Sequence, residues 1–193
     1  MCGRYYIDEE TEREIRKLVG DVDQTLGAMA AGDVRPSQSA AVVRGEHRHL
    51  TAGQMVWGFP RFDGKGLLIN ARAETAMEKR SFRESVRYRR CVIPARGFYE
   101  WNSRKEKYTF EYPGSPVIFM AGCYNMFDGQ NRFVILTTDA NPSVEPVHSR
   151  MPLVLDRTEL EDWVLNDAAA EGMLHKVPGM LEARAEYEQL GFF

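Results

Sequence analysis

Short apolar segments recur through most of the 193-residue chain, and clusters of Gly, Pro, Asn and Asp separate them. Many of these segments carry β-branched residues or alternate apolar with polar side chains, as strands with one buried face do. The pattern predicts strands at residues 41–44, 49–57, 67–70, 91–94, 97–101, 107–112, 117–123 and 132–138. So many short strands limit the chain to a sheet or a closed barrel.

Helical periodicity appears in three places. Asp8 is suited to cap a helix over EETEREIRKLV, with acids in the first turn and Gly20 at its end. A second helix is expected from about Met77 to Tyr88, and a third follows Asp156 in TELEDWVLN, with Leu160, Trp163 and Val164 facing inward. We therefore expect an α+β fold, with one compact domain over residues 1–193, a mostly antiparallel, barrel-like core and flanking helices.

Composition excludes several classes of protein. A 193-residue chain that is 44% hydrophobic can bury one substantial core. The longest apolar stretch, residues 117–124, is far shorter than the roughly 18 residues of a membrane helix, and the acidic N-terminal segment does not resemble a signal peptide. Three cysteines without a CxxC pair argue against a disulfide framework and a zinc site, and favour a reducing cytosol. Cys91 and Cys123 are expected in the core.

Charge is unevenly distributed along the chain. The net charge is −3, so no global field attracts nucleic acid. Between Lys79 and Arg90 there are six basic residues and one acid, whereas residues 156–193 hold three basic and nine acidic ones. This separation of basic from acidic residues permits a basic face on an acidic protein. An ordinary solvated helix face explains the basic run equally well.

Cys2 is the most reactive candidate. A small residue after Met1 allows an aminopeptidase to remove Met1, and Cys2 would then carry a free α-amine beside its thiol. The two groups have ordinary pKa values of about 7.7 to 8.0 and about 8.5, so both are partly nucleophilic at neutral pH. Such a 1,2-aminothiol condenses with aldehydes: the amine forms an imine and the sulfur closes it to a thiazolidine.

Other segments offer partners for this chemistry. In FYEW, strand alternation places Glu100 on the face of Phe98, where desolvation raises a carboxyl pKa towards the range of a general acid, although a lone strand Glu is more often exposed. His148 lies in a Pro-flanked loop, where a positioned imidazole can move protons and a surface role is equally common. Asn70 can hydrogen-bond a substrate oxygen or cap a turn.

Four segments in order, MCGR, NARAE, PARGFYEW and HSRMP, resemble the SRAP family of SOS response-associated peptidases, or abasic-site-processing proteins. The resemblance covers nearly the whole chain. It implies a single compact domain that binds single-stranded DNA and captures abasic sites through Cys2 as a DNA–protein crosslink, protecting the lesion during the DNA damage response. It also implies a lyase-like enzyme with N-terminal self-processing, acting as a monomer without cofactor, metal or membrane. Such a protein would be cytoplasmic, and nucleoid-associated when bound to DNA.

The resemblance also assigns site residues. The family's active-site positions fall on Asn70, Glu100 and His148 beside Cys2. Its phosphate contacts fall on Arg4, Arg72 and Arg150, and its base-packing residues on Pro36 and Trp57. We expect the active-site residues to converge at one end of the barrel, and the arginines to line one groove with part of the basic run, away from the acidic C-terminal segment.

Three positions depart from the family pattern. Phe62 stands where a second tryptophan is common, which weakens the expectation of base stacking in that segment. Arg96 stands where many members have aspartate, and Ser149 where aspartate or histidine often follows the catalytic histidine. These substitutions alter neighbours and leave the reacting groups in place.

Two other functions compete with abasic-site capture. Cys2, His148 and Glu100 also fit a thiol peptidase, with a nucleophile, a base and an orienting group. A non-covalent reader of modified or single-stranded DNA would keep Trp57 and the arginines and would not need a free Cys2. The requirement for the α-amine separates these functions.

Overall fold

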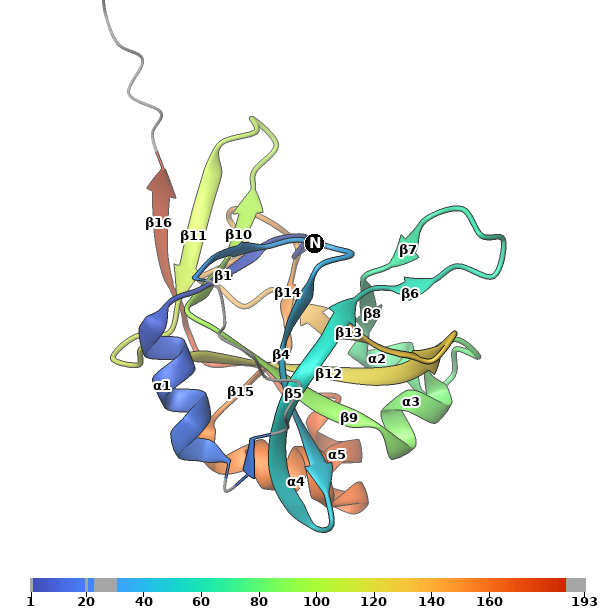
Figure 1. Ribbon diagram of the computed structural model, residues 1–193. Helices are drawn as coiled ribbons and strands as arrows, with labels where there is room; N and C mark the ends of the chain where they lie inside the picture. Colours follow the sequence, from blue (N-terminus) through green and yellow to red (C-terminus); the bar gives the residue numbers. More distant parts are fainter. Residues whose placement is uncertain (1, 20, 23–30, 187–193) are drawn as a thin grey trace, which may run out of the picture.

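The computed structural model describes residues 2–19, 21–22 and 31–186, and it confirms the α+β class (Figure 1). Five strands form a closed barrel in the order β13-β12-β9-β4-β5, and β5 pairs with β13 to complete the ring. The pairs within the barrel are antiparallel except for the parallel β5–β13 closure. These strands are β4 (Ser39–Glu46), β5 (His49–Trp57), β9 (Arg90–Ala95), β12 (Ile118–Phe127) and β13 (Gln130–Asp139).

A second sheet lies across one end of the barrel and carries the first strand of the chain, as Figure 1 shows. Its order is β16-β11-β10-β1-β3. These strands are β1 (Tyr5–Ile7), β3 (Gly32–Val34), β10 (Gly97–Trp101), β11 (Lys107–Glu111) and β16 (Glu182–Glu186). The edge strand β16 was not predicted from the sequence, because its charged residues alternate only with two alanines and the strand is mostly exposed.

Shorter strands extend the barrel and form one hairpin. β2 pairs with β5, β8 and β14 pair with β13, β15 pairs with β12, and β6 pairs with β7. Their bounds are β2 (Asp21–Val22), β6 (Phe59–Pro60), β7 (Leu67–Leu68), β8 (Asn70–Arg72), β14 (Arg150–Pro152) and β15 (Val154–Leu155). The predicted strand at 67–70 is therefore divided, because its first half pairs within the hairpin and Asn70 pairs with β13.

Helices surround the barrel. Helix α1 (Glu9–Leu18) begins at Asp8, whose carboxylate accepts a hydrogen bond from the Thr11 backbone N–H at 2.8 Å, as predicted for the cap. Gly20, expected to end this helix, lies outside the described residues. The helices at the C-terminal side are η1 (Arg157–Glu159), α4 (Leu160–Leu165) and α5 (Asp167–Met173), and Leu160, Trp163 and Val164 are buried as predicted.

The prediction of a single helix from Met77 to Tyr88 is wrong. The chain forms α2 (Ala73–Ala76) and α3 (Arg83–Tyr88), with turns between them. Phe82 at the start of α3 packs its ring against Phe59, with ring centroids 6.1 Å apart. The chain turns before Phe82, and this turn brings the aromatic ring into the core.

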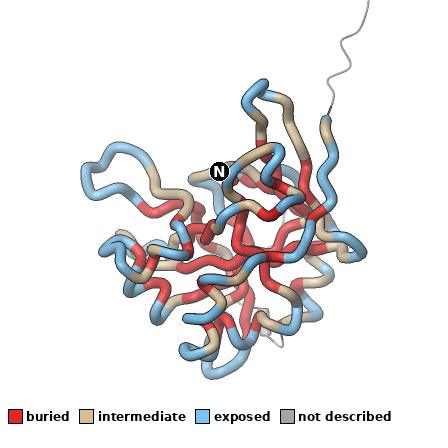
Figure 2. Tube along the Cα trace, turned by 180° about the vertical axis from the view of Figure 1, so that it is seen from behind, coloured by how far each residue is buried: buried red, intermediate tan, exposed pale blue. Residues whose placement is uncertain are grey.

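Alternation along the strands divides the core into two layers. On β13, Phe133 and Ile135 pack in a cluster with Cys2, Tyr5 and Phe98, whereas the intervening residues pack with the helices. Figure 2 shows buried residues along the barrel strands and exposed residues at the hairpin ends. The predicted core cysteines, Cys91 and Cys123, are fully buried and free. No helix among the described residues is long and apolar enough to span a membrane.

Gly97 allows β10 to lie close to its neighbours, and a pair of Gly→Ala variants tests this. A Cβ at Gly97 would lie 2.5 Å from the Phe110 carbonyl oxygen, which is backbone and cannot move aside easily. We expect Gly97→Ala to lower the free energy of unfolding by about 1–3 kcal/mol. Gly172 in α5 has no atom within 4 Å of its Cβ position, so Gly172→Ala should raise stability by up to about 1 kcal/mol. Urea denaturation measures both, and equal effects would contradict this packing argument.

Candidate active site

The pairing of β1 with β10 brings Cys2 to Glu100. Tyr5 lies opposite Phe98, and the Arg4 carbonyl accepts a hydrogen bond of 3.0 Å from the next backbone N–H of β10. Cys2 precedes Arg4 by two residues. Because the two strands are antiparallel, Cys2 therefore lies beside the last residues of β10, which include Glu100. Two residues nearly one hundred positions apart in the chain thus become neighbours.

Asn70 holds the backbone of Cys2. It begins β8, which runs parallel to β13 with Asn70 opposite Ile135. Its side-chain Nδ2 donates a hydrogen bond of 2.9 Å to the Cys2 carbonyl oxygen. Within the described residues, its Oδ1 is buried and has no hydrogen-bond partner. The amide therefore positions Cys2 and leaves one acceptor available to a ligand.

Glu100 is a buried acid, only 3% exposed, which decides between the buried and exposed alternatives that the sequence left open. Burial raises the pKa of its carboxyl above the usual value, and the charge of His148 partly offsets this increase. Glu100 therefore holds its proton to a higher pH than an exposed glutamate does. This is the behaviour required of a general acid.

The Cys2 thiol is fully buried, and its Sγ donates a long hydrogen bond of 3.9 Å to the Arg4 carbonyl. Burial raises the thiol pKa strongly, and the charge of Glu100 raises it further. Asn70 and Glu100 thus lie beside Cys2, and His148 is close enough to Glu100 to interact with its charge. The thiol is held in its neutral form in this environment.

His148 lies at the end of a turn-rich segment, residues 141–148, that is closed by backbone hydrogen bonds. Its Nδ1 accepts a hydrogen bond of 2.9 Å from the Arg150 backbone N–H. The same nitrogen also lies 3.2 Å from the Arg150 carbonyl oxygen, so both backbone polar groups of Arg150 lie beside it. Ser149, the family departure beside it, joins this segment to β13 by accepting a hydrogen bond from the Ala140 N–H at 3.0 Å.

The three arginines expected to contact phosphate differ in their surroundings. Arg72 is exposed on β8, whereas Arg4 is 31% exposed and lies 3.6 Å from Asp33 and 5.3 Å from the ring centre of Trp101. Arg150 is only 11% exposed in its side chain. Arg72 and Arg150 begin or end strands that pair with the same end of β13. The family departure Arg96 pairs with Asp8 and Glu111 at 3.8 and 3.1 Å.

Trp57 does not present a surface for base stacking, which corrects the prediction. Its ring is fully buried, lies 5.2 Å from the ring of Tyr5, and donates a hydrogen bond of 2.9 Å from Nε1 to the Ile69 carbonyl. Trp57 therefore supports the strand that carries Asn70. Pro36 is half-buried in a turn whose backbone is hydrogen-bonded to that of Trp57.

Phe62 is an exposed aromatic residue in this region, although its departure from the family pattern had weakened the expectation of base stacking there. It lies between β6 and β7 and is fully exposed. It lines a cavity of about 810 Å³ with Arg61 and Arg80. The sequence could have indicated this exposure, because Phe62 stands in the polar, glycine-containing stretch RFDGKG, where no neighbouring apolar residues suggest burial.

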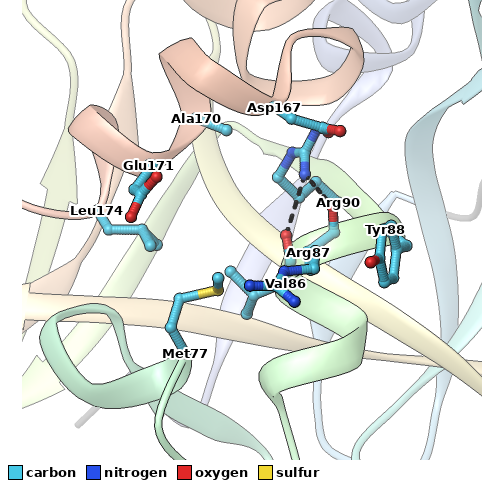
Figure 3. A pocket seen from close by; sticks show the side chains of 9 residues that line it. All are labelled: Met77, Val86, Arg87, Tyr88, Arg90, Asp167, Ala170, Glu171 and Leu174. Carbon is cyan, nitrogen blue, oxygen red and sulfur yellow. Dashed lines mark hydrogen bonds and ion pairs between the residues drawn. The ribbon is translucent and has the colours of Figure 1, made fainter.

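Part of the basic run packs against the acidic C-terminal segment and so is not available to a groove that lies away from it. Arg90 is buried, and its guanidinium donates to the Trp163 carbonyl at 2.6 Å and to Asp167 at 2.6 Å. Arg87 lines a cavity of about 290 Å³ with Glu171 of α5, as Figure 3 shows. This part of the run joins helices α3, α4 and α5, while Arg80 lies beside Phe62.

The electrostatic link between Glu100 and Cys2 predicts a change in thiol reactivity. Because the charge of Glu100 raises the thiol pKa, Glu100→Gln should lower that pKa and increase the thiolate fraction at a given pH. We expect faster alkylation of Cys2 by iodoacetamide across pH 7–9, followed by peptide mass spectrometry. Cys123, buried elsewhere, serves as the internal control. An unchanged rate at Cys2 would contradict the proposed coupling.

Solved structures of other proteins share the fold of this chain. A solved structure from Bordetella bronchiseptica superposes with a TM-score of 0.79 at 24% identity, covering 97% of this chain and 100% of the other. Another from Bacteroides thetaiotaomicron gives 0.81 at 22% identity, covering 95% and 91%. At these identities the likeness establishes the fold.

The chain is also similar in sequence to named proteins of two bacteria. The chain is 31% identical to the abasic site processing protein YoqW of Bacillus subtilis, over 85% of this chain and 80% of the relative. It is 27% identical to the abasic site processing protein YedK of Escherichia coli, over 89% and 82%. Residues 1–188 match the family described as SOS response associated peptidase (SRAP). The chain therefore belongs to the SRAP family.

Proposed function

We propose that this protein captures abasic sites in single-stranded DNA through a covalent bond to Cys2, after removal of Met1. The observation that carries the proposal is the buried, proton-retaining Glu100 beside Cys2, whose backbone Asn70 holds. The names of the relatives from Bacillus subtilis and Escherichia coli indicate the same substrate class. The crosslink would protect the lesion during the DNA damage response.

The reaction is a condensation followed by ring closure. The α-amine of Cys2 attacks the C1′ aldehyde of the open sugar, and loss of water gives an imine. The Cys2 sulfur then bonds to the imine carbon while the carbon–nitrogen double bond becomes single, and the thiol proton passes to nitrogen. The product is a thiazolidine. Glu100 supplies the proton that the departing oxygen takes up as water.

Two further side chains assist these steps. His148, with Nδ1 held by the Arg150 N–H, presents Nε2 as a proton donor to the sugar hydroxyl during ring opening. The Asn70 Oδ1, which has no hydrogen-bond partner among the described residues, accepts from the α-amine or a sugar hydroxyl. Both groups orient the sugar over the amine, which lowers the entropic cost of attack.

The DNA strand is held through its backbone and one flanking base. Arg4, Arg72 and Arg150 contact phosphates, which carry no base information. We assign base stacking to the exposed Phe62 in place of the buried Trp57. Pro36, on a turn anchored to Trp57, acts as a wedge beside the lesion. These contacts favour a single strand over intact duplex.

The raised pKa of the Cys2 thiol favours this function over a thiol peptidase. A peptidase nucleophile needs a readily formed thiolate, and here burial and Glu100 both oppose one. In the condensation the amine attacks first, and the sulfur reacts only once the imine is held beside it. Self-processing at Met1 is the peptidase activity that the proposal retains.

Variants at the N-terminus test the order of the two nucleophiles. Cys2→Ser and Cys2→Ala, each with Met1 removed, should form an imine that borohydride traps but no heat-stable adduct, because the ring-closing sulfur is missing. An uncleaved N-terminal extension on the wild-type sequence should abolish both adducts and leave non-covalent DNA binding intact. A denaturing gel with an abasic oligonucleotide measures all three proteins.

The same gel separates the competing functions. An oligonucleotide without the abasic site is the matched control and should give no covalent band with any variant. A heat-stable adduct formed by the extended, uncleaved protein would refute the aminothiol mechanism and favour a simple cysteine nucleophile. A reversible shift without any covalent band would favour a DNA reader.

The raised pKa of Glu100 predicts the pH dependence of capture. As pH rises, the α-amine loses its proton and becomes nucleophilic, while Glu100 loses the proton that it must donate. The rate of adduct formation should therefore pass through a maximum. The Glu100→Gln variant should form the adduct more slowly. Its rate should no longer fall at high pH and should instead rise towards a plateau. A falling limb that persists in Glu100→Gln would show that another group supplies the proton.

A further inference from the structure

Arg150 has no outer hydrogen-bond donor left for a ligand. Its Nη1 donates to Glu74 at 2.7 Å and to Asp139 at 2.6 Å. Its Nη2 donates to Glu74 at 2.9 Å and to the Thr137 carbonyl at 2.7 Å. Its Nε has no hydrogen-bond partner among the described residues, but this atom is buried and does not reach solvent. A phosphate therefore reaches this guanidinium only by replacing one of the present partners.

The two carboxylates hold Arg150 differently. Glu74 uses both oxygens in a two-bond pairing with Nη1 and Nη2, and its side chain is 38% exposed. Asp139 uses one oxygen, and its side chain is 91% exposed. A single contact from an exposed carboxylate is weak, whereas the two-bond geometry fixes the plane of the guanidinium. Asp139 is the partner that a competing anion displaces most easily.

Thr137 is less easily replaced than Asp139. Its carbonyl belongs to the buried backbone of β13, which is paired with both β8 and β14 at this point. With Glu74 and Thr137 retained, loss of Asp139 releases one hydrogen on Nη1. That hydrogen lies on the solvent-facing side of the arginine, because the departing side chain is itself almost fully exposed.

We propose that Asp139 occupies the place of a DNA phosphate on Arg150 and is displaced when single-stranded DNA binds, while Glu74 is a positioning residue that keeps the guanidinium in place. This inference rests on the proposed DNA-binding function. A phosphate oxygen takes the Nη1 hydrogen released by Asp139, so the count of hydrogen bonds to Arg150 is conserved. The exchange lowers affinity for any single strand, because each binding event must separate an ion pair.

Two isosteric variants with the same change in charge test this division of roles. At fixed ionic strength, Asp139→Asn should bind a fluorescent single-stranded oligonucleotide without an abasic site about two- to fivefold more tightly than wild type. Glu74→Gln should bind it at least about threefold more weakly, because the guanidinium loses its two-bond support. Glu161→Gln, at an exposed position on α4, is the control for net charge and should change affinity little. Fluorescence anisotropy measures all four proteins.

These affinities test the role of Asp139 without involving the covalent reaction at Cys2. Equal tightening by Asp139→Asn and Glu74→Gln would show a general charge effect and overturn the proposal, as would an unchanged affinity in Asp139→Asn. Because Asp139 is almost fully exposed, its variant decides the matter even if Glu74→Gln unfolds, which thermal denaturation reports. If adducts form normally while Asp139→Asn has no effect, the proposed function stands and this inference fails. If wild type binds no single strand and forms no adduct, both fail.

Discussion

The parallel pairing of β5 with β13 closes the barrel, and the candidate site depends on this closure. At one end β13 pairs with β5 through Arg132 and Phe133, and further along it pairs with β8 and β14. Those two short strands carry Asn70 and Arg150. The strand that completes the barrel thus also determines where two of the proposed functional side chains lie.

The second sheet supplies the reacting groups at the same end of the molecule. β1 and β10 carry Tyr5 and Phe98 into a core shared with the barrel strands, so the sheet cannot shift without opening that core. Cys2 and Glu100 are therefore held by packing as well as by hydrogen bonds. Rigid support of this kind suits a reaction in which two nucleophilic groups on one residue must meet the same carbon.

Burial of Glu100 makes the stability of the folded protein depend on pH. Its pKa is higher in the folded protein than in the unfolded chain, so the folded state holds the proton more firmly. The stability that this group contributes is fully present below the ordinary carboxyl pKa, and it is lost as pH rises through the raised value. A purely structural position would favour an apolar side chain there, which is why a buried acid indicates chemistry.

The sequence by itself determined the local features of this protein. Period-two alternation placed most barrel strands and put Glu100 on the strand face of Phe98, and a capping aspartate placed the start of α1. These are properties of neighbouring residues. The order of the four motifs also indicated the family, which is confirmed, and through the family it pointed to Asn70, whose side chain contacts the Cys2 backbone.

Only the tertiary structure decided which aromatic and basic residues face solvent. Trp57 and Phe62 lie five positions apart, yet one is fully buried and the other fully exposed, because the strand of Trp57 enters the barrel and the hairpin beyond it projects from the surface. Arg90 pairs with carbonyls and an acid far along the chain, and Arg150 is enclosed by Glu74 and Asp139. A charge or a ring takes its role from partners that folding brings to it, and sequence spacing does not reveal those partners.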